Sequence, residues 1–354
     1  MTLTQSRNSR NSNLELYRII VMILIVAHHY VVNSGLKPII QTDPLSAQSI
    51  FLYLFGAWGK TGINCFVLIT GYFMCQSSIT VRKFLKLILE IYFYKFLIFF
   101  IFILLGYESL NFKTLILKLL PTTSIAQNFT GCFIIFYLCI PFLNKLIQNI
   151  DQRMHRNLVI LALTTYTLFS LIPSFNISLN YVSWFCVLYI ISSYIRFYGL
   201  LPSFKTKHWG YCTLVSITLS VVSILAMLNL FPGHWPYKFV SDSNSLFAVT
   251  TGISSFMFFK SLNIKHSALI NAIGGSTFGV LLIHANSNAM RSWLWYDTLN
   301  NAGSYGSDSL YIHAFASVLI VFTVCIILDR LRILFIEKPT FVYVDKMLAK
   351  YRLK

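Results

Sequence analysis

The sequence predicts an all-α, polytopic integral membrane protein with about ten transmembrane helices. Hydrophobic residues make up 56% of the 354 residues and charged residues only 11%, whereas a soluble domain carries roughly 25% charged residues. Apolar stretches of membrane-spanning length also follow one another along the chain. These observations argue against a soluble domain, a disordered chain and a secreted disulfide scaffold. The seven cysteines show neither CxxC spacing nor an even disulfide framework.

Ten apolar stretches are predicted to cross the membrane, and two shorter ones are predicted to lie at or near its surface. The expected spans are approximately residues 14–34, 60–76, 84–106, 131–148, 157–173, 181–197, 211–231, 245–261, 269–290 and 310–336. The first is expected to be an uncleaved span, because no small-x-small cleavage site closes it. Residues 45–57 are apolar but short, which favours a re-entrant or interfacial helix. Residues 110–120 have apolar side chains at helical spacing, which is typical of an interfacial helix.

The distribution of basic residues predicts that both termini are cytoplasmic. The chain has 28 Lys and Arg against 11 Asp and Glu, a formal net charge of +17. With the N-terminus inside, the inner segments carry 21 of the 28 basic residues and the outer segments six, while Lys95 falls inside the third span. This asymmetry follows the positive-inside rule, so the excess does not indicate a nucleic-acid partner. We expect a multi-pass protein of the cell membrane with a cytoplasmic tail (1–13), a membrane domain (14–339) and a basic cytoplasmic tail (340–354).

The first predicted span carries an unusual set of ionisable residues, namely Glu15, Arg18, His28 and His29. Ionisable residues inside a bilayer are costly and indicate function. Helical geometry places Glu15, Arg18 and His29 on one stripe, with Arg18 and His29 about 16 Å apart along the axis and His28 turned about 100° away. Taken singly, Arg18 is also typical of a positive-inside anchor and a buried histidine of a structural hydrogen bond. The combination of adjacent histidines with Arg18 and Glu15 on one span favours a functional role for at least one of the two histidines.

Three further features are less specific. The glycines of residues 59–71 allow either close helix packing or the close approach of a ligand to the histidines. Arg82, Lys83 and Lys86 fit either the positive-inside rule or a cytoplasmic phosphate-binding cluster. His284, in the ninth span, fits a structural or a functional hydrogen bond. No HExxH motif or paired His/Cys cluster predicts a metal, and no Walker or GxGxxG loop predicts a nucleotide fold.

Short segments spread over most of the chain resemble the motifs of one family. They are Arg18 with His29 (an Arg-x10-His pair), Phe66 to Gly71-Tyr72, Lys83-x-x-Lys86, Phe133–Tyr137 with Pro141–Asn144, Thr277–His284, and Arg332 to Glu337-Lys338-Pro339. Together they resemble acyltransferase family 3, a family of integral membrane acyltransferases, many of which O-acetylate bacterial surface polysaccharides. The chain departs from the family pattern at Cys132, where tryptophan is common, at Leu281, where tyrosine is common, and at Lys83 and Lys86, where arginine is usual.

The resemblance implies a membrane O-acyltransferase that moves an acetyl or other short acyl group from acyl-CoA to a sugar hydroxyl of a cell-envelope or exported polysaccharide. It implies acetyl-CoA as a co-substrate, no tightly bound cofactor, and a glycan or lipid-linked sugar as acceptor. The expected catalytic residues are His29, His28 and Arg18, and the expected donor-binding residues are Arg18, Arg82, Lys83 and Lys86. The expected supporting residues are Glu15, Asn64, Phe66, Gly71, Tyr72, Tyr137 and His284.

Two other function classes stay open at the level of sequence. A proton-coupled secondary transporter would also use intramembrane histidine, arginine and glutamate, although the chain lacks the paired broken helices typical of such transporters. A structural partner in an envelope-assembly complex would have little reason to carry these costly charges. Within the acyltransferase interpretation, His29 fits both a general base and a nucleophile that forms an acyl-histidine.

Overall fold

The computed structural model describes residues 11–119, 129–172, 175, 179–232 and 236–351, and within these ranges it contains helices and no strand. Residues 1–10 and 352–354 of the predicted tails lie outside the described residues. The helices in chain order are α1 (Ser12–Val32), α2 (Leu36–Thr42), α3 (Ala47–Phe55), α4 (Gly59–Met74), α5 (Val81–Leu104), α6 (Phe112–Leu119), α7 (Phe129–Gln148), α8 (Gln152–Leu163), η1 (Thr164–Leu168), η2 (Phe169–Leu171), α9 (Tyr181–Tyr198), α10 (Thr206–Leu230), α11 (Leu246–Ser261), α12 (Ala268–Gly274), α13 (Thr277–His284), α14 (Asn288–Arg291), η3 (Ser292–Thr298), α15 (Leu310–Arg332), η4 (Ile333–Glu337) and α16 (Lys338–Lys350).

Six helical stretches of the described chain are long and apolar enough to cross a membrane. They are α1, α3 with α4 (Ala47–Met74), α5, α7, α10, and α15 with α16 (Leu310–Lys350). A seventh results if the pair Ala268–His284 and Asn288–Thr298, which is bent by 96°, counts as one span. The all-helical, multi-pass fold is therefore confirmed, but the predicted count of ten is not.

The predicted spans that miss this criterion do so for identifiable reasons. Each of them overlaps a helix, but α11 has only 16 residues and α8 only 12 before the helix continues as the π-helical turn η1. The tyrosines, serines and Arg196 of α9 lower its mean hydropathy. The shorter predicted elements are present as helices: α3 lies within 45–57 and α6 within 110–120.

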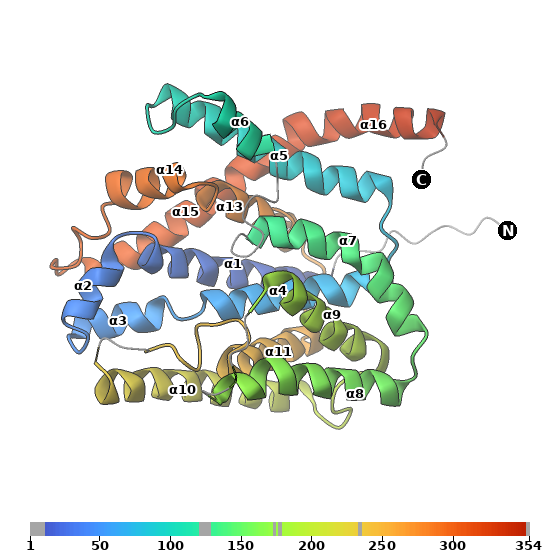
Figure 1. The fold of residues 1–354 in the computed structure, drawn as a ribbon, viewed down its shortest axis with the longest axis horizontal. Coiled ribbons are helices and arrows are strands. Elements are labelled where there is room, and N and C mark those ends of the chain that lie inside the picture. Colours follow the sequence, from blue (N-terminus) through green and yellow to red (C-terminus); the bar gives the residue numbers. More distant parts are fainter. Residues whose placement is uncertain (1–10, 120–128, 173–174, 176–178, 233–235, 352–354) are drawn as a thin grey trace.

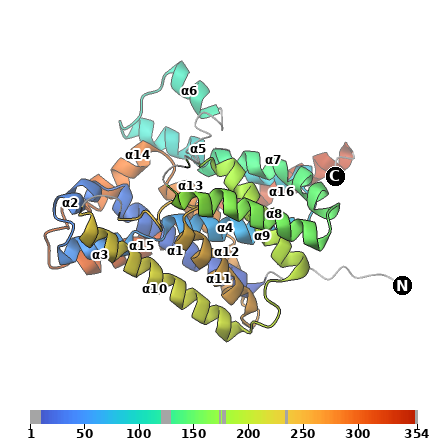
Figure 2. The same ribbon diagram turned by 60° about the horizontal axis from the view of Figure 1, so that its bottom comes forward.

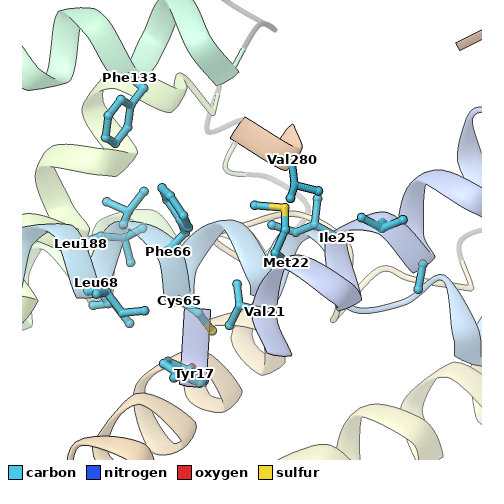
Figure 3. Packing of buried hydrophobic residues seen from close by; sticks show 14 of the residues in the cluster. Tyr17, Val21, Met22, Ile25, Cys65, Phe66, Leu68, Phe133, Leu188 and Val280 are labelled. Atoms are coloured by element: carbon cyan, nitrogen blue, oxygen red, sulfur yellow. The ribbon is translucent and has the colours of Figure 1, made fainter. Parts of the chain in front are cut away.

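Helix α1 runs through the middle of the bundle and provides the frame for the site (Figure 1). It begins at Asn11, whose side chain accepts a hydrogen bond from the backbone N–H of Asn13 and so caps the helix. The hydroxyl of Ser12 donates to Oδ1 of Asn271 at 3.0 Å, which ties this end to α12. One side of α1 packs into the core, where Met22 and Ile25 lie beside Val280 of α13 (Figure 3). Because α1 contacts several helices, its polar residues are placed at the centre of the molecule.

Helix α4 packs closely against its neighbours because its glycines leave room for them. A side chain at Gly71 would overlap Ser192 of α9, and one at Gly62 would press on Ile25 of α1. Between these positions, the buried Asn64 accepts a hydrogen bond from the Trp184 indole at 2.8 Å and donates to the carbonyl of Ser243 at 2.6 Å. A buried amide that is fully hydrogen-bonded fixes the relative positions of the segments it joins.

A buried cluster of charges joins α5 to the C-terminal helices. The guanidinium of Arg332, only 5% exposed, pairs with Asp329 at 2.9 Å, Glu337 at 2.8 Å and Glu90 of α5 at 3.1 Å. Lys86 of α5 pairs with Glu337 at 2.6 Å. Buried charges are tolerated only when they are paired, so this ion cluster connects two helices that are distant in sequence.

The periphery is less compact than the centre. Helix α6 stands away from the bundle and α10 lies along its outer side (Figure 2). Helix α1 begins and α16 ends toward the same end of the bundle (Figure 1), an arrangement compatible with two termini on one side of a membrane.

Candidate active site

A cavity of about 610 Å³ lies beside the C-terminal half of α1. The first residues of α4, α7 and α9, the middle of α5 and the segment that follows α13 complete its wall. The polar side chains that line it are His28, His29, Lys60, Lys95, Thr130, Tyr181, Asn286, Ser287, Asn288 and Arg291, and the apolar ones include Met22, Ile25, Phe66 and Ile91. The cavity therefore combines imidazoles, cations and hydrogen-bonding groups on an apolar base.

The stripe predicted on the first span reaches this cavity along part of its length. Met22, Ile25 and His29 line the wall, as their shared helix face requires. Arg18 and Glu15 do not line it: they form an ion pair at 3.0 Å, one helical turn apart, nearer the start of α1. The structure thus places His29 in the cavity and Arg18 outside it, about three helical turns from His29 and one turn from the lining residue Met22.

His29 is held by a second histidine. Its Nδ1 lies 2.9 Å from Nε2 of His284 at the end of α13, and Nδ1 of His284 lies 2.6 Å from the carbonyl oxygen of Val280. His284 is fully buried, whereas His29 is partly exposed to the cavity. These contacts form a chain from the backbone of α13 through two imidazoles to the cavity.

The hydrogen bonds assign the tautomers of both rings. The Val280 carbonyl only accepts, so Nδ1 of His284 carries a proton and, in a neutral ring, its Nε2 is an acceptor. Nδ1 of His29 must then donate to it, which leaves Nε2 of His29 with a lone pair. A nitrogen with a lone pair, oriented by a buried partner and facing a cavity, is the arrangement that a general base or a nucleophile needs.

His28 also lines the cavity, although helical geometry turns it away from the predicted stripe. Its Nδ1 lies 2.6 Å from the carbonyl oxygen of Gly56, in the turn before α4. A side chain at Gly59 would overlap the imidazole of His28. This glycine therefore makes room for the histidine, which is the close-approach role considered for the glycines of residues 59–71. His28 differs from His29 in that its orienting partner is a backbone carbonyl.

The cavity is strongly cationic. Lys60, Lys95 and Arg291 line it, and no aspartate or glutamate is among the described lining residues. Lys60 donates a hydrogen bond to the hydroxyl of Tyr181, and Nη1 of Arg291 donates to Oδ1 of Asn288 at 3.2 Å. Such a lining favours anionic groups, including the oxyanion of a tetrahedral intermediate.

The basic residues predicted to bind the donor lie elsewhere and already have partners. Arg82 pairs with Asp345 at 2.6 Å, Lys83 donates to Ser77 at 2.5 Å, and Lys86 belongs to the ion cluster with Glu337. None of the three lines the cavity. The structure therefore does not bring them together with the histidines.

The predicted supporting residues Phe66 and Tyr72 lie at different positions along α4. Phe66 lines the cavity, and its ring lies 6.4 Å from that of Phe133, which packs against Tyr137 of α7. Tyr72 and Phe73 lie at the opposite end of α4. The Tyr72 hydroxyl accepts from Nη1 of Arg196 at 2.8 Å.

Three cations surround this aromatic pair. Arg196 and Lys260 approach the ring of Tyr72 at 4.7 and 5.9 Å, and Arg18 lies 6.0 Å from the ring of Phe73. The pair therefore carries a second basic cluster at the end of α4 away from the cavity. Nothing in the sequence connects Arg18 with Arg196 and Lys260, which come from other helices.

A family model described as an acyltransferase domain matches residues 11–330. The chain belongs to acyltransferase family 3. The matched range contains all the described residues that line the cavity, and it contains both His29 and His284. The protein is therefore an acyltransferase with a multi-pass helical fold, as its motifs predicted. Comparison with curated proteins and with solved structures returned no match.

Sequence reasoning missed the cationic side of this acyltransferase cavity. Lys60 and Arg291 are two of the six basic residues on the predicted outer segments. Their departure from the positive-inside rule was a usable signal, as was the position of Lys95 inside a predicted span. In the described ranges no group of three or more His, Cys, Asp or Glu side chains is placed to hold a metal ion.

Proposed function

We propose that this acyltransferase moves an acetyl or other short acyl group from acyl-CoA to a sugar hydroxyl of a cell-envelope or exported polysaccharide. The observation that carries the proposal is His29, which faces the cavity and donates through Nδ1 to the buried His284. An acceptor hydroxyl is a weak nucleophile at neutral pH and needs a base to remove its proton as it attacks. The lone pair on Nε2 of His29 supplies that base.

The reaction then follows from the positions of the groups. The acceptor oxygen attacks the thioester carbonyl while Nε2 of His29 takes the hydroxyl proton, and positive charge on the ring is stabilised by the hydrogen bond to His284. The cations of the cavity favour the tetrahedral oxyanion. When the carbon–sulfur bond breaks, His29 returns the proton to the departing CoA thiolate. The ester and free CoA are the products. An acyl-histidine route uses the same nitrogen as a nucleophile.

The donor is proposed to enter from the end of α1 where Arg18 lies. CoA is anionic, and the inner basic residues Arg18, Lys83 and Lys86 are candidates to hold its phosphates. Arg196 and Lys260 join Arg18 around Tyr72 and Phe73, which strengthens this end as a docking region. The pantetheine arm would extend along α1 past Met22, the lining residue of α1 nearest to Arg18. The acceptor would enter from the opposite, predicted outer side.

The transporter alternative is not favoured, because the family match covers most of the chain and the histidines form a hydrogen-bonded pair within one cavity. To test the proposal, the full-length protein is purified and the release of free CoA thiol from acetyl-CoA is measured with and without candidate glycan acceptors. In parallel, surface glycans of cells with and without the protein are compared by mass spectrometry. We expect acceptor-dependent thiol release and an acetyl-sized mass difference. Active protein in cells without any acyl difference on glycans would contradict the acceptor class.

A further inference from the structure

Lys60 and Arg291 lie in the cavity beside His29 without any acidic partner. Neither forms an ion pair in the part of the chain that the structure describes, and the described lining of the cavity contains no carboxylate. By contrast, the buried guanidinium of Arg332 is neutralised by Asp329, Glu337 and Glu90. Unpaired charge away from bulk water is costly, so these two cations call for a negative group that the chain itself does not supply.

Arg291 presents the geometry of an anion receptor. Its Nη1 donates to Asn288 at 3.2 Å, whereas its Nε is buried without a hydrogen-bond partner. The Nε and Nη2 edge of a guanidinium is one of the two-donor forks that bind carboxylates and phosphates through paired hydrogen bonds. An anion along this edge would satisfy Nε and neutralise the side chain at once.

Lys60 lines the same cavity, and its side chain is held by Tyr181. Its ammonium donates to the Tyr181 hydroxyl and lies 5.1 Å from the centre of that ring, so two of its three N–H donors stay available for a ligand. It is the second residue of α4 and directly follows Gly59, the residue that accommodates His28. A ligand held by Lys60 would therefore lie next to the imidazoles.

We propose that Lys60 and Arg291 form an anion subsite that selects an acyl acceptor bearing a carboxylate or phosphate close to the hydroxyl that is acylated. This inference rests on the proposed function and names the acceptor class. Donor phosphates fit the subsite poorly, because the long pantetheine arm of an extended acyl-CoA keeps them away from the thioester, which must react at His29. A group beside His29 belongs instead to the molecule whose hydroxyl His29 deprotonates.

The test measures binding separately from acyl transfer. Purified full-length protein in lipid nanodiscs is titrated by thermal shift with paired probes, methyl glucuronide against methyl glucoside and glycerol 3-phosphate against glycerol, and with adenosine 3′,5′-bisphosphate as a donor fragment. Each probe is measured on the native protein and on Lys60→Gln and Arg291→Gln. Lys37→Gln is the matched control, since Lys37 is exposed and does not line the cavity. Arg291→Lys keeps the charge and guards against a folding defect.

We expect an anionic probe to bind about tenfold more tightly than its neutral partner, because each charge-assisted hydrogen bond lost corresponds to roughly that ratio. The preference should disappear in Lys60→Gln and Arg291→Gln and persist in Lys37→Gln and, in large part, in Arg291→Lys. The absence of a preference in both pairs would overturn the inference. A preference that persists in both Lys60→Gln and Arg291→Gln would also overturn it. So would substitutions that weaken the binding of adenosine 3′,5′-bisphosphate but not of the anionic acceptor probes. Acceptor-dependent thiol release without any anion preference would leave the proposed function standing and refute only the subsite.

Discussion

The protonation states of His29 and His284 are linked, because one hydrogen bond joins the two rings and a backbone carbonyl fixes the second. If His284 gained a proton on Nε2, it could no longer accept the bond from His29. Acid therefore removes the basic nitrogen in two ways, by protonating His29 directly and by disrupting its orientation. Activity should rise with pH through the titration of the imidazoles and fall on acidification. The measurement is the rate of acyl transfer as a function of pH at saturating donor. A rate that does not fall on acidification would contradict the prediction.

Substitution of His29 separates chemistry from structure. His29→Ala should lose about 10²–10⁴-fold in transfer, the usual contribution of a positioned base, because no other described group donates a lone pair at the same place. His28→Ala should retain more activity, since its ring is held by the Gly56 carbonyl and not by His284. Transfer in membranes is measured at matched expression.

The amide variant supplies the decisive control for this prediction. His29→Gln preserves hydrogen bonding but removes the base, so it should be nearly as inactive as His29→Ala. Near-normal transfer by His29→Gln would remove His29 from the chemistry. A greater loss in His28→Ala than in His29→Ala would reverse their roles.

His284 should act as a positioning residue. His284→Ala leaves His29 without its partner, and the loss of such an orienting group typically lowers activity about 10–100-fold. The effect should appear in kcat and in the pH profile, with little change in the KM for acyl-CoA. His284→Gln offers an oxygen acceptor to Nδ1 of His29 and should recover part of kcat. His313→Ala is the control for general destabilisation. It removes a partly buried histidine that is hydrogen-bonded to the Tyr30 hydroxyl and the Leu299 carbonyl.

At the scale of helices, the start of α4 is shaped by the histidine it faces. Gly59→Ala should destabilise the protein or displace His28, because the added methyl overlaps the imidazole and overpacking usually costs about 1–3 kcal/mol. The double variant Gly59→Ala with His28→Ala should regain thermal stability, since the ring is gone. Gly210→Ala, where a methyl meets Phe258 at 3.3 Å, is the milder control. Equal stability of the single and double variants would show that the two positions do not interact.

The start of α5 offers a test of donor binding. If Lys83 and Lys86 hold CoA phosphates, replacing both with alanine should raise the KM for acetyl-CoA by about tenfold or more, with little effect on the acceptor KM. Lys86 also pairs with Glu337, so Glu337→Gln is needed as a control that removes the ion pair but keeps the cation. Steady-state kinetics with both substrates varied provides the comparison. An unchanged donor KM in the double variant, or the same change in Glu337→Gln, would assign these lysines to structure.

Helices were easier to predict than their ends and breaks. Continuous apolar stretches identify α1, α5, α7 and α10 directly, because the bilayer length sets a clear expectation. The 96° bend after α13 has no comparable signal: residues 269–290 read as one apolar span, and the short polar stretch that breaks it also lines the cavity. Local sequence does not show which backbone groups will be satisfied by distant helices.

At the scale of the whole molecule, orientation follows from charge. With 21 of 28 basic residues on the predicted inner segments, tags on both termini should be cytoplasmic and a tag near Asp242 external. Accessibility of these tags in intact and permeabilised cells is the measurement. The cavity would then open toward the outer side, while the cluster around Tyr72 faces inward. Termini on opposite sides would mean an odd number of spans and would invalidate the assignment of donor and acceptor sides.

The site was only partly predictable, for a reason that concerns the whole chain. Arg18, His28 and His29 lie on one helix, so their relative positions follow from helical geometry. His284 meets His29 across 255 residues of sequence, and Lys60 and Arg291 come from other segments. Periodicity within one helix does not predict contacts between residues of different helices, because these contacts depend on how the bundle packs.

The ion cluster around Arg332 has a consequence for the biosynthesis of the protein. Glu90 emerges from the ribosome early, and its partner Arg332 follows 242 residues later. The Glu90 carboxylate therefore lacks this partner during most of translation. Helix α13, which carries His284 of the candidate site, is also made late, and its Gly279 packs against Asp329 of the last span. The last span to be made, which begins at Leu310, thus completes the charge balance of the cluster. A prematurely terminated chain would retain an unneutralised acid within the bilayer, a defect that membrane quality-control proteases are able to recognise.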